Sequence, residues 1–154
     1  EKAEARVQHI IRLALLGAFR RCSIRAEQSG KDGRTDLEIV EDQERSHDQI
    51  VNHAILELKV LREKGSTGNK YTDSQIATHM HDGVEQAYQY GTRRNFCEKM
   101  LCCFDMRATN AGEAKVMAPL EKEAKALGVD LRHWFLYRSS EHWRKCAVAK
   151  ALCS

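Results

Sequence analysis

The stretch that decides the fold is TDLEIVEDQERSHDQIVNHAILELKVLREK, residues 35–64, the most regularly patterned part of the chain. Apolar residues recur in it at alternating intervals of three and four, a spacing that places them along one side of an α-helix. The pattern continues over four heptads and predicts a helix whose a/d positions are buried against other helices. The positions of this predicted seam are Leu37, Val40, Glu44, His47, Val51, Ala54, Leu58 and Leu61.

The composition favours an all-α protein that forms one domain over residues 1–154. The chain has 154 residues, of which 42% are hydrophobic and 31% charged, the balance of a globular domain. It contains one proline and nine glycines, which is little material for the turns of an all-β fold. We therefore expect an antiparallel bundle of four to five helices, with residues 35–64 in the core seam.

Capping and turn residues set the other predicted boundaries. Thr72 and Gln75 form a capping box, and Tyr71 and Ile76 flank it as a hydrophobic staple, so this helix start is the best defined. Gly128 is placed to end the helix before it. The predicted helices span residues 2–27, 35–64, 72–104, 119–127 and 130–152.

Glu44 and His47 are the polar members of the seam and lie one helical turn apart. We interpret them as a buried polar layer that stabilises the bundle. Ferritin-like carboxylate proteins use the same three-residue pairing to hold two metal ions. The segment EDQERSHDQI, residues 41–50, resembles the metal-binding helix of that family, which implies a di-metal site as an alternative.

A second resemblance concerns two further segments, IATHMHD at residues 76–82 and CFDM at residues 103–106. They resemble the metal-binding segments of the HD-domain phosphohydrolases, which are helical enzymes. The resemblance implies a divalent metal that activates water. Its implied ligands are His47, His81, Asp82 and Asp105. Without this alternative, no cofactor is expected.

The net charge and the hydropathy of the sequence narrow the classes of partner that we expect for this protein. A formal charge of +3 is too small to predict a nucleic-acid partner, and no apolar run reaches the roughly 20 residues of a membrane span. The first predicted helix is apolar on every side between Leu13 and Phe19, and such a segment is normally covered all round. We expect Leu13, Leu15, Leu16 and Phe19 to contact a protein partner or a second copy of the chain.

The six cysteines include no C-x-x-C pair, so zinc-ribbon and thioredoxin-like sites lack their spacing. A domain of this size needs no disulfides, and we expect free thiols and an intracellular, reducing compartment. No catalytic residue is predicted, and Cys102 and Cys103 have no base beside them in the sequence that would support a catalytic thiol.

These observations favour a non-enzymatic role, as a helical interaction or structural subunit of a larger assembly. The alternative is an HD-like metal-dependent phosphohydrolase, and a ferritin-like carboxylate di-metal protein is third. A metal bound by His47 would separate either enzyme from the subunit.

Overall fold

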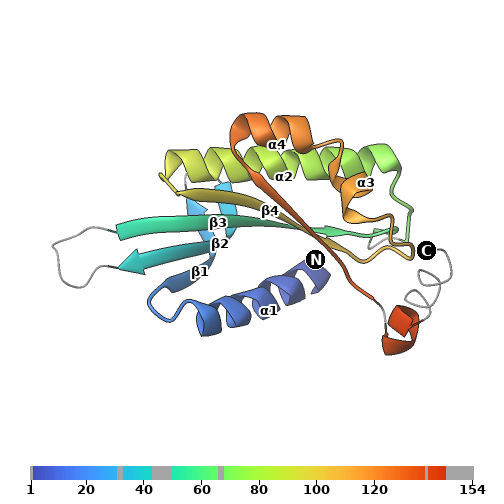
Figure 1. The fold of residues 1–154 in the computed structure, drawn as a ribbon, viewed down its shortest axis with the longest axis horizontal. Coiled ribbons are helices and arrows are strands. Elements are labelled where there is room, and N and C mark those ends of the chain that lie inside the picture. Colours follow the sequence, from blue (N-terminus) through green and yellow to red (C-terminus); the bar gives the residue numbers. More distant parts are fainter. Residues whose placement is uncertain (1, 31–32, 43–49, 66–67, 138, 145–154) are drawn as a thin grey trace.

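The computed structural model describes residues 2–30, 33–42, 50–65, 68–137 and 139–144, and these form an α/β protein (Figure 1). The named elements, in chain order, are α1 (Lys2–Ala18), β1 (Ser23–Gly30), β2 (Gly33–Asp42), β3 (Ile50–Leu61), α2 (Asp73–Arg93), β4 (Glu98–Asp105), α3 (Glu113–Met117), α4 (Glu121–Leu127) and β5 (Asp130–Phe135).

The strands form one mixed sheet in the order β1-β2-β3-β4-β5. The first three strands are antiparallel, and β3, β4 and β5 are parallel to one another. Parallel neighbours need a crossover connection, which α2 provides between β3 and β4, and α3 with α4 between β4 and β5. The crossover helices lie on one face of the sheet and α1 lies on the other (Figure 1).

Each face of the sheet has its own apolar core. On the face covered by α2, side chains such as Leu61, Val84 and Leu101 pack together with those of α3 and α4. On the other face, Leu58 and Phe104 pack with the inner side of α1. The central strands are therefore buried on both faces, as in other α/β sheets.

The predicted all-α bundle is wrong, and residues 35–64 explain why. Within this stretch, residues 35–42 belong to β2 and residues 50–61 form β3, so it is not one helix. The helical seam left Ile39, Ile55, Leu56 and Val60 unassigned, although every one of them is apolar. A strand buried on both faces accounts for all of them, because such strands are continuous apolar runs rather than alternating ones.

Two predicted boundaries are confirmed. The capping box of Thr72 and Gln75 begins α2, with both of its hydrogen bonds formed. Gly128 ends α4 in the left-handed conformation, at φ 62°. The predicted third helix ends early, at Arg93, and the chain turns at Asn95, with φ 52°, into β4.

Two other helices were also predicted wrongly. The first helix ends at Ala18, and the residues after it form β1. The segment from Asp130, predicted as the last helix, begins with β5, where Val129 and Leu131 contribute to the core instead of a helix face. Tertiary pairing with β4 decides this strand, since parallel partners are distant in sequence.

Candidate functional site

The candidate site lies on β3, in the sequence Glu57-Leu58-Lys59. Alternate residues of a strand point to the same face, so Glu57 and Lys59 both face α2. The helix comes close here because Gly83 has no side chain. A Cβ at that position would lie 3.0 Å from Cε of Lys59 and 2.8 Å from Cδ1 of Leu101.

Glu57 and Lys59 form a buried ion pair. Nζ of Lys59 donates to Oε1 of Glu57 at 2.7 Å and to Oε1 of Gln86 on α2 at 2.8 Å. Only 5% of the Glu57 side chain is exposed. Its second oxygen, Oε2, is buried and has no hydrogen-bond partner in the described part of the chain. A buried oxygen without a partner is destabilising, so this atom calls for a functional explanation.

Asp36 on β2 adds a second carboxylate. The β2–β3 register pairs Leu37 with Leu56, and one further step places Asp36 across from Glu57. Oδ2 of Asp36 accepts a hydrogen bond from the backbone N–H of Leu58 at 2.8 Å, which holds the carboxylate against β3. Gln8 of α1 donates to the backbone oxygen of Asp36 at 2.9 Å and links the helix to this position.

Negative charge gathers at Glu57. Burial, the largest influence, raises the pKa of Glu57 to about 7. The ammonium of Lys59 opposes this shift, whereas Asp36 and Glu4 of α1 add to it. The carboxylates of Asp36 and Glu4 therefore both act on Glu57, and a bound cation would offset their combined negative charge.

A cavity of about 440 Å³ is lined on β3 from Val60 onward, the residue after Lys59, whereas Asp36, Glu57 and Lys59 themselves do not line it. Glu4, His79 and Asp82 line it together with Arg62 and Tyr71. Burial lowers the pKa of the His79 imidazole, and the positive charge of Lys59 lowers it further. The charges of Lys59 and Glu4 act on Glu57 and His79 alike: Lys59 lowers the pKa of each, and Glu4 raises the pKa of each.

The residue types fit a small divalent cation. Magnesium binds carboxylate oxygens, and usually only one or two of them, with water and substrate oxygens completing the shell. Oε2 of Glu57 and the carboxylate of Asp36 supply two such ligands. A cation there would also satisfy the buried oxygen and return the pKa of Glu57 to a lower value.

The implied HD-type ligands do not come together among the described residues. His81 pairs with Glu123 of α4, whereas Asp82, next to it in sequence, lines the cavity. Neither belongs to a group of three potential ligands. His47, and Glu44 with it, lies outside the described residues, so the predicted polar layer and the ferritin-like pairing stay untested.

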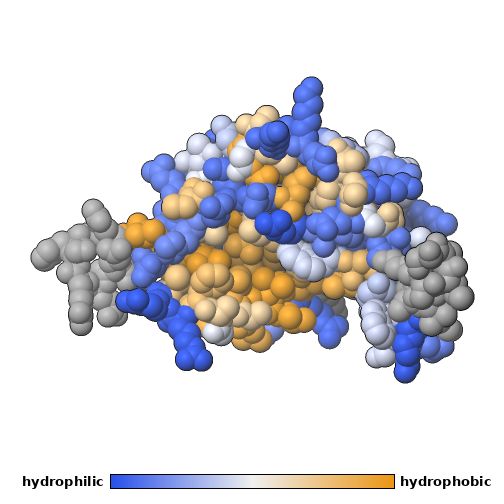
Figure 2. Space-filling view, viewed as in Figure 1, coloured by the Kyte–Doolittle hydropathy of each residue, from blue (hydrophilic) through white to orange (hydrophobic). Residues whose placement is uncertain are grey.

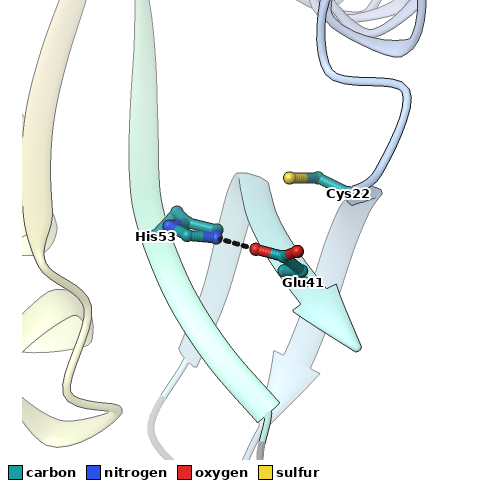
Figure 3. A group of neighbouring side chains, drawn as sticks. All are labelled: Cys22, Glu41 and His53. Atoms are coloured by element: carbon teal, nitrogen blue, oxygen red, sulfur yellow. Dashed lines mark hydrogen bonds and ion pairs between the residues drawn. The ribbon is translucent and has the colours of Figure 1, made fainter. Parts of the chain in front are cut away.

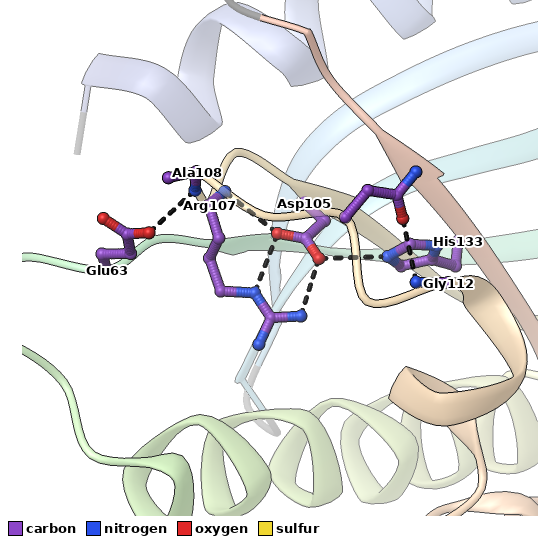
Figure 4. A network of polar contacts seen from close by, with 7 residues as sticks. Glu63, Asp105, Arg107, Ala108, Gly112 and His133 are labelled. Carbon is purple, nitrogen blue, oxygen red and sulfur yellow. Dashed lines mark hydrogen bonds and ion pairs between the residues drawn. The ribbon is translucent and has the colours of Figure 1, made fainter. Parts of the chain in front are cut away.

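Asp105 has a different role at the end of β4 (Figure 4). Its carboxylate accepts from Nε and Nη2 of Arg107 at 2.9 and 2.7 Å, and Nε2 of His133 lies 3.3 Å away. Burial alone would raise the pKa of Asp105, but the hydrogen bonds and charge of Arg107, with His133, lower it. These contacts occupy the carboxylate and connect β4 to β5.

The predicted contact residues of the first helix divide into two groups. Leu15 packs against the sheet core, whereas Leu13, Leu16 and Phe19 are exposed. Ile10 is exposed as well, and hydrophobic residues gather over α1 in Figure 2. We call Ile10, Leu13, Leu16 and Phe19 the outer face of α1.

Sequence reasoning missed Asp36, Glu57 and Lys59. The helical prediction placed Glu57 and Lys59 outside the seam, where charged residues are ordinary. The available signal was the apolar run AILELKVL at residues 54–61, which two charged residues interrupt at a spacing of two. In a strand buried on both faces, such residues are unusual and indicate a site.

The chain matches no protein family, and no curated protein or solved structure is detectably similar to it. None of the described helices is both long and apolar enough to cross a bilayer. What the fold and site define is therefore a class only: an α/β protein with a carboxylate–lysine group on a central strand.

Proposed function

We propose that this protein is a divalent-metal-dependent hydrolase of phosphodiester bonds, acting through Asp36, Glu57 and Lys59. The observation that carries the proposal is the buried Oε2 of Glu57, which has no hydrogen-bond partner among the described residues, beside the ammonium of Lys59. Asp36 and Glu57 would hold the cation. When bound, such an ion polarises a phosphoryl oxygen and lowers the pKa of a coordinated water.

Lys59 provides the second positive charge that the reaction needs. An ammonium has three N–H groups, and those on Lys59 include the donors to Glu57 and Gln86. These two contacts fix the position of Nζ and leave one N–H for a phosphate oxygen or for the attacking water. Negative charge grows on the phosphoryl oxygens in the transition state, so a positioned cation accelerates the step.

Nucleic acid is the substrate class that the cavity favours. Arg62 and Tyr71 line it beside Glu4 and His79. A guanidinium binds phosphate, and an exposed aromatic ring stacks on a base. This proposal departs from the expectation based on net charge, which averages over the whole chain, whereas the charges lining the cavity act on the substrate directly.

The test is an assay of single- and double-stranded DNA and RNA with Mg²⁺ or Mn²⁺. We expect cleavage that EDTA stops. We also expect Glu57→Gln and Lys59→Gln each to lose at least about 100-fold in rate, the size usual for groups that stabilise the transition state. Glu85→Gln, on the exposed side of α2, is the matched control and should cleave like the wild type.

Metal binding is measured separately, by titrating Mn²⁺ and following its spectroscopic signal. One ion per chain at this site should be lost in Glu57→Gln and in Asp36→Asn, with circular dichroism unchanged. Absence of cleavage on every substrate with either metal, or full activity in folded Glu57→Gln, contradicts the proposed function.

A second candidate is the non-enzymatic one, an interaction subunit that binds through α1. The outer face of α1 supports it, because soluble monomers rarely expose a contiguous apolar patch. The partner we propose is a second copy of the chain. The HD-like and ferritin-like alternatives assumed a helical fold, which is not the fold of this chain.

We also propose the reducing, intracellular compartment expected from the cysteines. The four that lie in the described residues, Cys22, Cys97, Cys102 and Cys103, are free thiols. Burial raises the pKa of both Cys102 and Cys103 to about 12, so neither is a reactive thiolate.

A further inference from the structure

A second group of potential ligands lies at the other end of the first three strands. Cys22 precedes β1, Glu41 is near the end of β2, and His53 is near the start of β3. The antiparallel order brings these three segments to one end of the sheet, and their side chains point toward one another (Figure 3). Nothing in the proposed hydrolysis uses this group.

A β-bulge aims His53 at the group. The register pairs Ile39 with Ala54 but Val40 with Asn52, so His53 is an extra residue on β3. Bulges of this kind rotate a side chain away from its regular direction. As a result, Nε2 of His53 lies 2.9 Å from Oε2 of Glu41.

The distances suit a tetrahedral ion. The ligand atoms of Cys22, Glu41 and His53 all lie within 4.8 Å of one another. In a tetrahedral zinc site, bonds of about 2.0 to 2.3 Å separate ligand atoms by roughly 3.3 to 3.8 Å. Side-chain adjustments of about an ångström would therefore bring the three atoms to one ion.

The group also has room for a fourth ligand. It borders a cavity of about 660 Å³, which Cys97 and Arg21 line as well. Zinc sites with three protein ligands hold water or a substrate in the fourth position. A thiolate and a carboxylate balance the two charges of the ion, so the arginine charge nearby does not prevent its binding.

We propose that Cys22, Glu41 and His53 bind one zinc ion, at a site separate from Asp36 and Glu57. The donor set of sulfur, nitrogen and oxygen selects zinc over magnesium, which prefers oxygen ligands alone. The ion connects the start of β1 with the β2–β3 pair. It therefore stabilises this end of the sheet.

The test uses the full chain, freed of metal and titrated with Co²⁺ as a spectroscopic probe for zinc. We expect one Co²⁺ per chain to give a thiolate-to-cobalt charge-transfer band and the visible bands of tetrahedral coordination, apart from any Co²⁺ held by Asp36 and Glu57, and Zn²⁺ should displace this ion. Cys22→Ser should remove the charge-transfer band. His53→Gln and Glu41→Gln should each weaken binding at least tenfold.

Two control variants make the assignment specific. Cys97→Ser and Glu57→Gln should keep the charge-transfer band at its full intensity per chain, since neither residue is a proposed ligand of this zinc ion. Circular dichroism of the metal-free variants confirms that each is folded. The proposal is overturned if the folded wild type shows no thiolate band, if Cys22→Ser keeps it, or if His53→Gln binds as tightly as the wild type.

Discussion

At the scale of single residues, the two buried glutamates on the α2 face of the sheet differ in the cation with which each is paired. Glu38 on β2 is paired with Arg94, whose guanidinium lies just after α2. Glu57 pairs with the ammonium of Lys59, which also contacts Gln86 of α2, and burial raises the pKa of Glu57 to about 7. We place the proposed chemistry at Glu57 because it shares β3 with Lys59 and lies across from Asp36.

The raised pKa of Glu57 predicts a pH-dependent stability in the absence of metal. The folded value is about 7 and the ordinary value 4.5, so the folded state binds the proton more tightly than the unfolded state. Stability is therefore greatest at acid pH and falls as pH rises from about 4.5 through 7. Between pH 5 and pH 8 we expect a loss of about 2 kcal/mol from this group, since one pKa unit corresponds to about 1.4 kcal/mol.

Urea unfolding in EDTA at pH 5 and pH 8 measures this effect. Glu57→Gln should lack the loss, and the exposed control Glu85→Gln should retain it. Equal pH dependence in the wild type and Glu57→Gln would show that the carboxyl is not protonated in the fold.

At the scale of elements, α2 is the helix that positions the site. Gln86 contacts Lys59, and the capping box at Thr72 fixes where the helix begins. Gly83 and Gly91 both face the sheet, where an added Cβ would collide with Lys59 and Leu101 or with Lys99. Gly91 lies inside α2, which is continuous to Arg93.

Gly83→Ala should therefore destabilise the protein, by about 1 to 3 kcal/mol, the range for overpacking a well-filled core. It should also slow the proposed hydrolysis, because the methyl group displaces Lys59. The matched control is Gly17→Ala in α1, where no atom lies within 4 Å of the added Cβ. That change should stabilise the helix by up to about 1 kcal/mol. Thermal unfolding of both variants measures these changes in stability. If Gly83→Ala leaves the melting temperature unchanged, α2 lies farther from β3 than in this structure.

At the scale of the whole molecule, the two faces of the sheet are covered unequally. Among the named helices, α2, α3 and α4 lie on one face and α1 lies on the other (Figure 1). A single helix can pack its inner side only, so the apolar residues on its outer side remain exposed. Leu13 is 56% and Phe19 44% exposed. Burying such side chains contributes about 1.5 to 3 kcal/mol each, enough to drive association.

Light scattering tests the predicted self-association. The wild type should be a dimer or larger, and Leu16→Glu should be a folded monomer, since this side chain lies on the outer face. Leu15→Glu is the contrasting variant and should unfold the protein, because Leu15 packs against the sheet. A monomeric wild type at all concentrations would contradict the prediction.

Two helix boundaries of this protein could be predicted from local sequence signals. The start of α2 at Thr72 and the end of α4 at Gly128 follow from groups that interact within one turn of helix, so they can be recognised without a fold. The exposure of Leu13 and Phe19 was also foreseeable, because a segment apolar on all sides cannot be covered by one neighbour.

Only the tertiary structure decided the strands and both candidate sites. The sequence of β2 and β3 is compatible both with a helix and with strands that are buried on both faces. Pairing with β1 and β4 decides between these two structures. That choice brings Asp36 to Glu57, and Cys22 to His53, across separations in sequence that no local pattern spans. Strand pairing joins segments that are distant in sequence, so its contribution to the free energy of folding cannot be read from any single segment. For this reason, both sites could be recognised only in the folded chain.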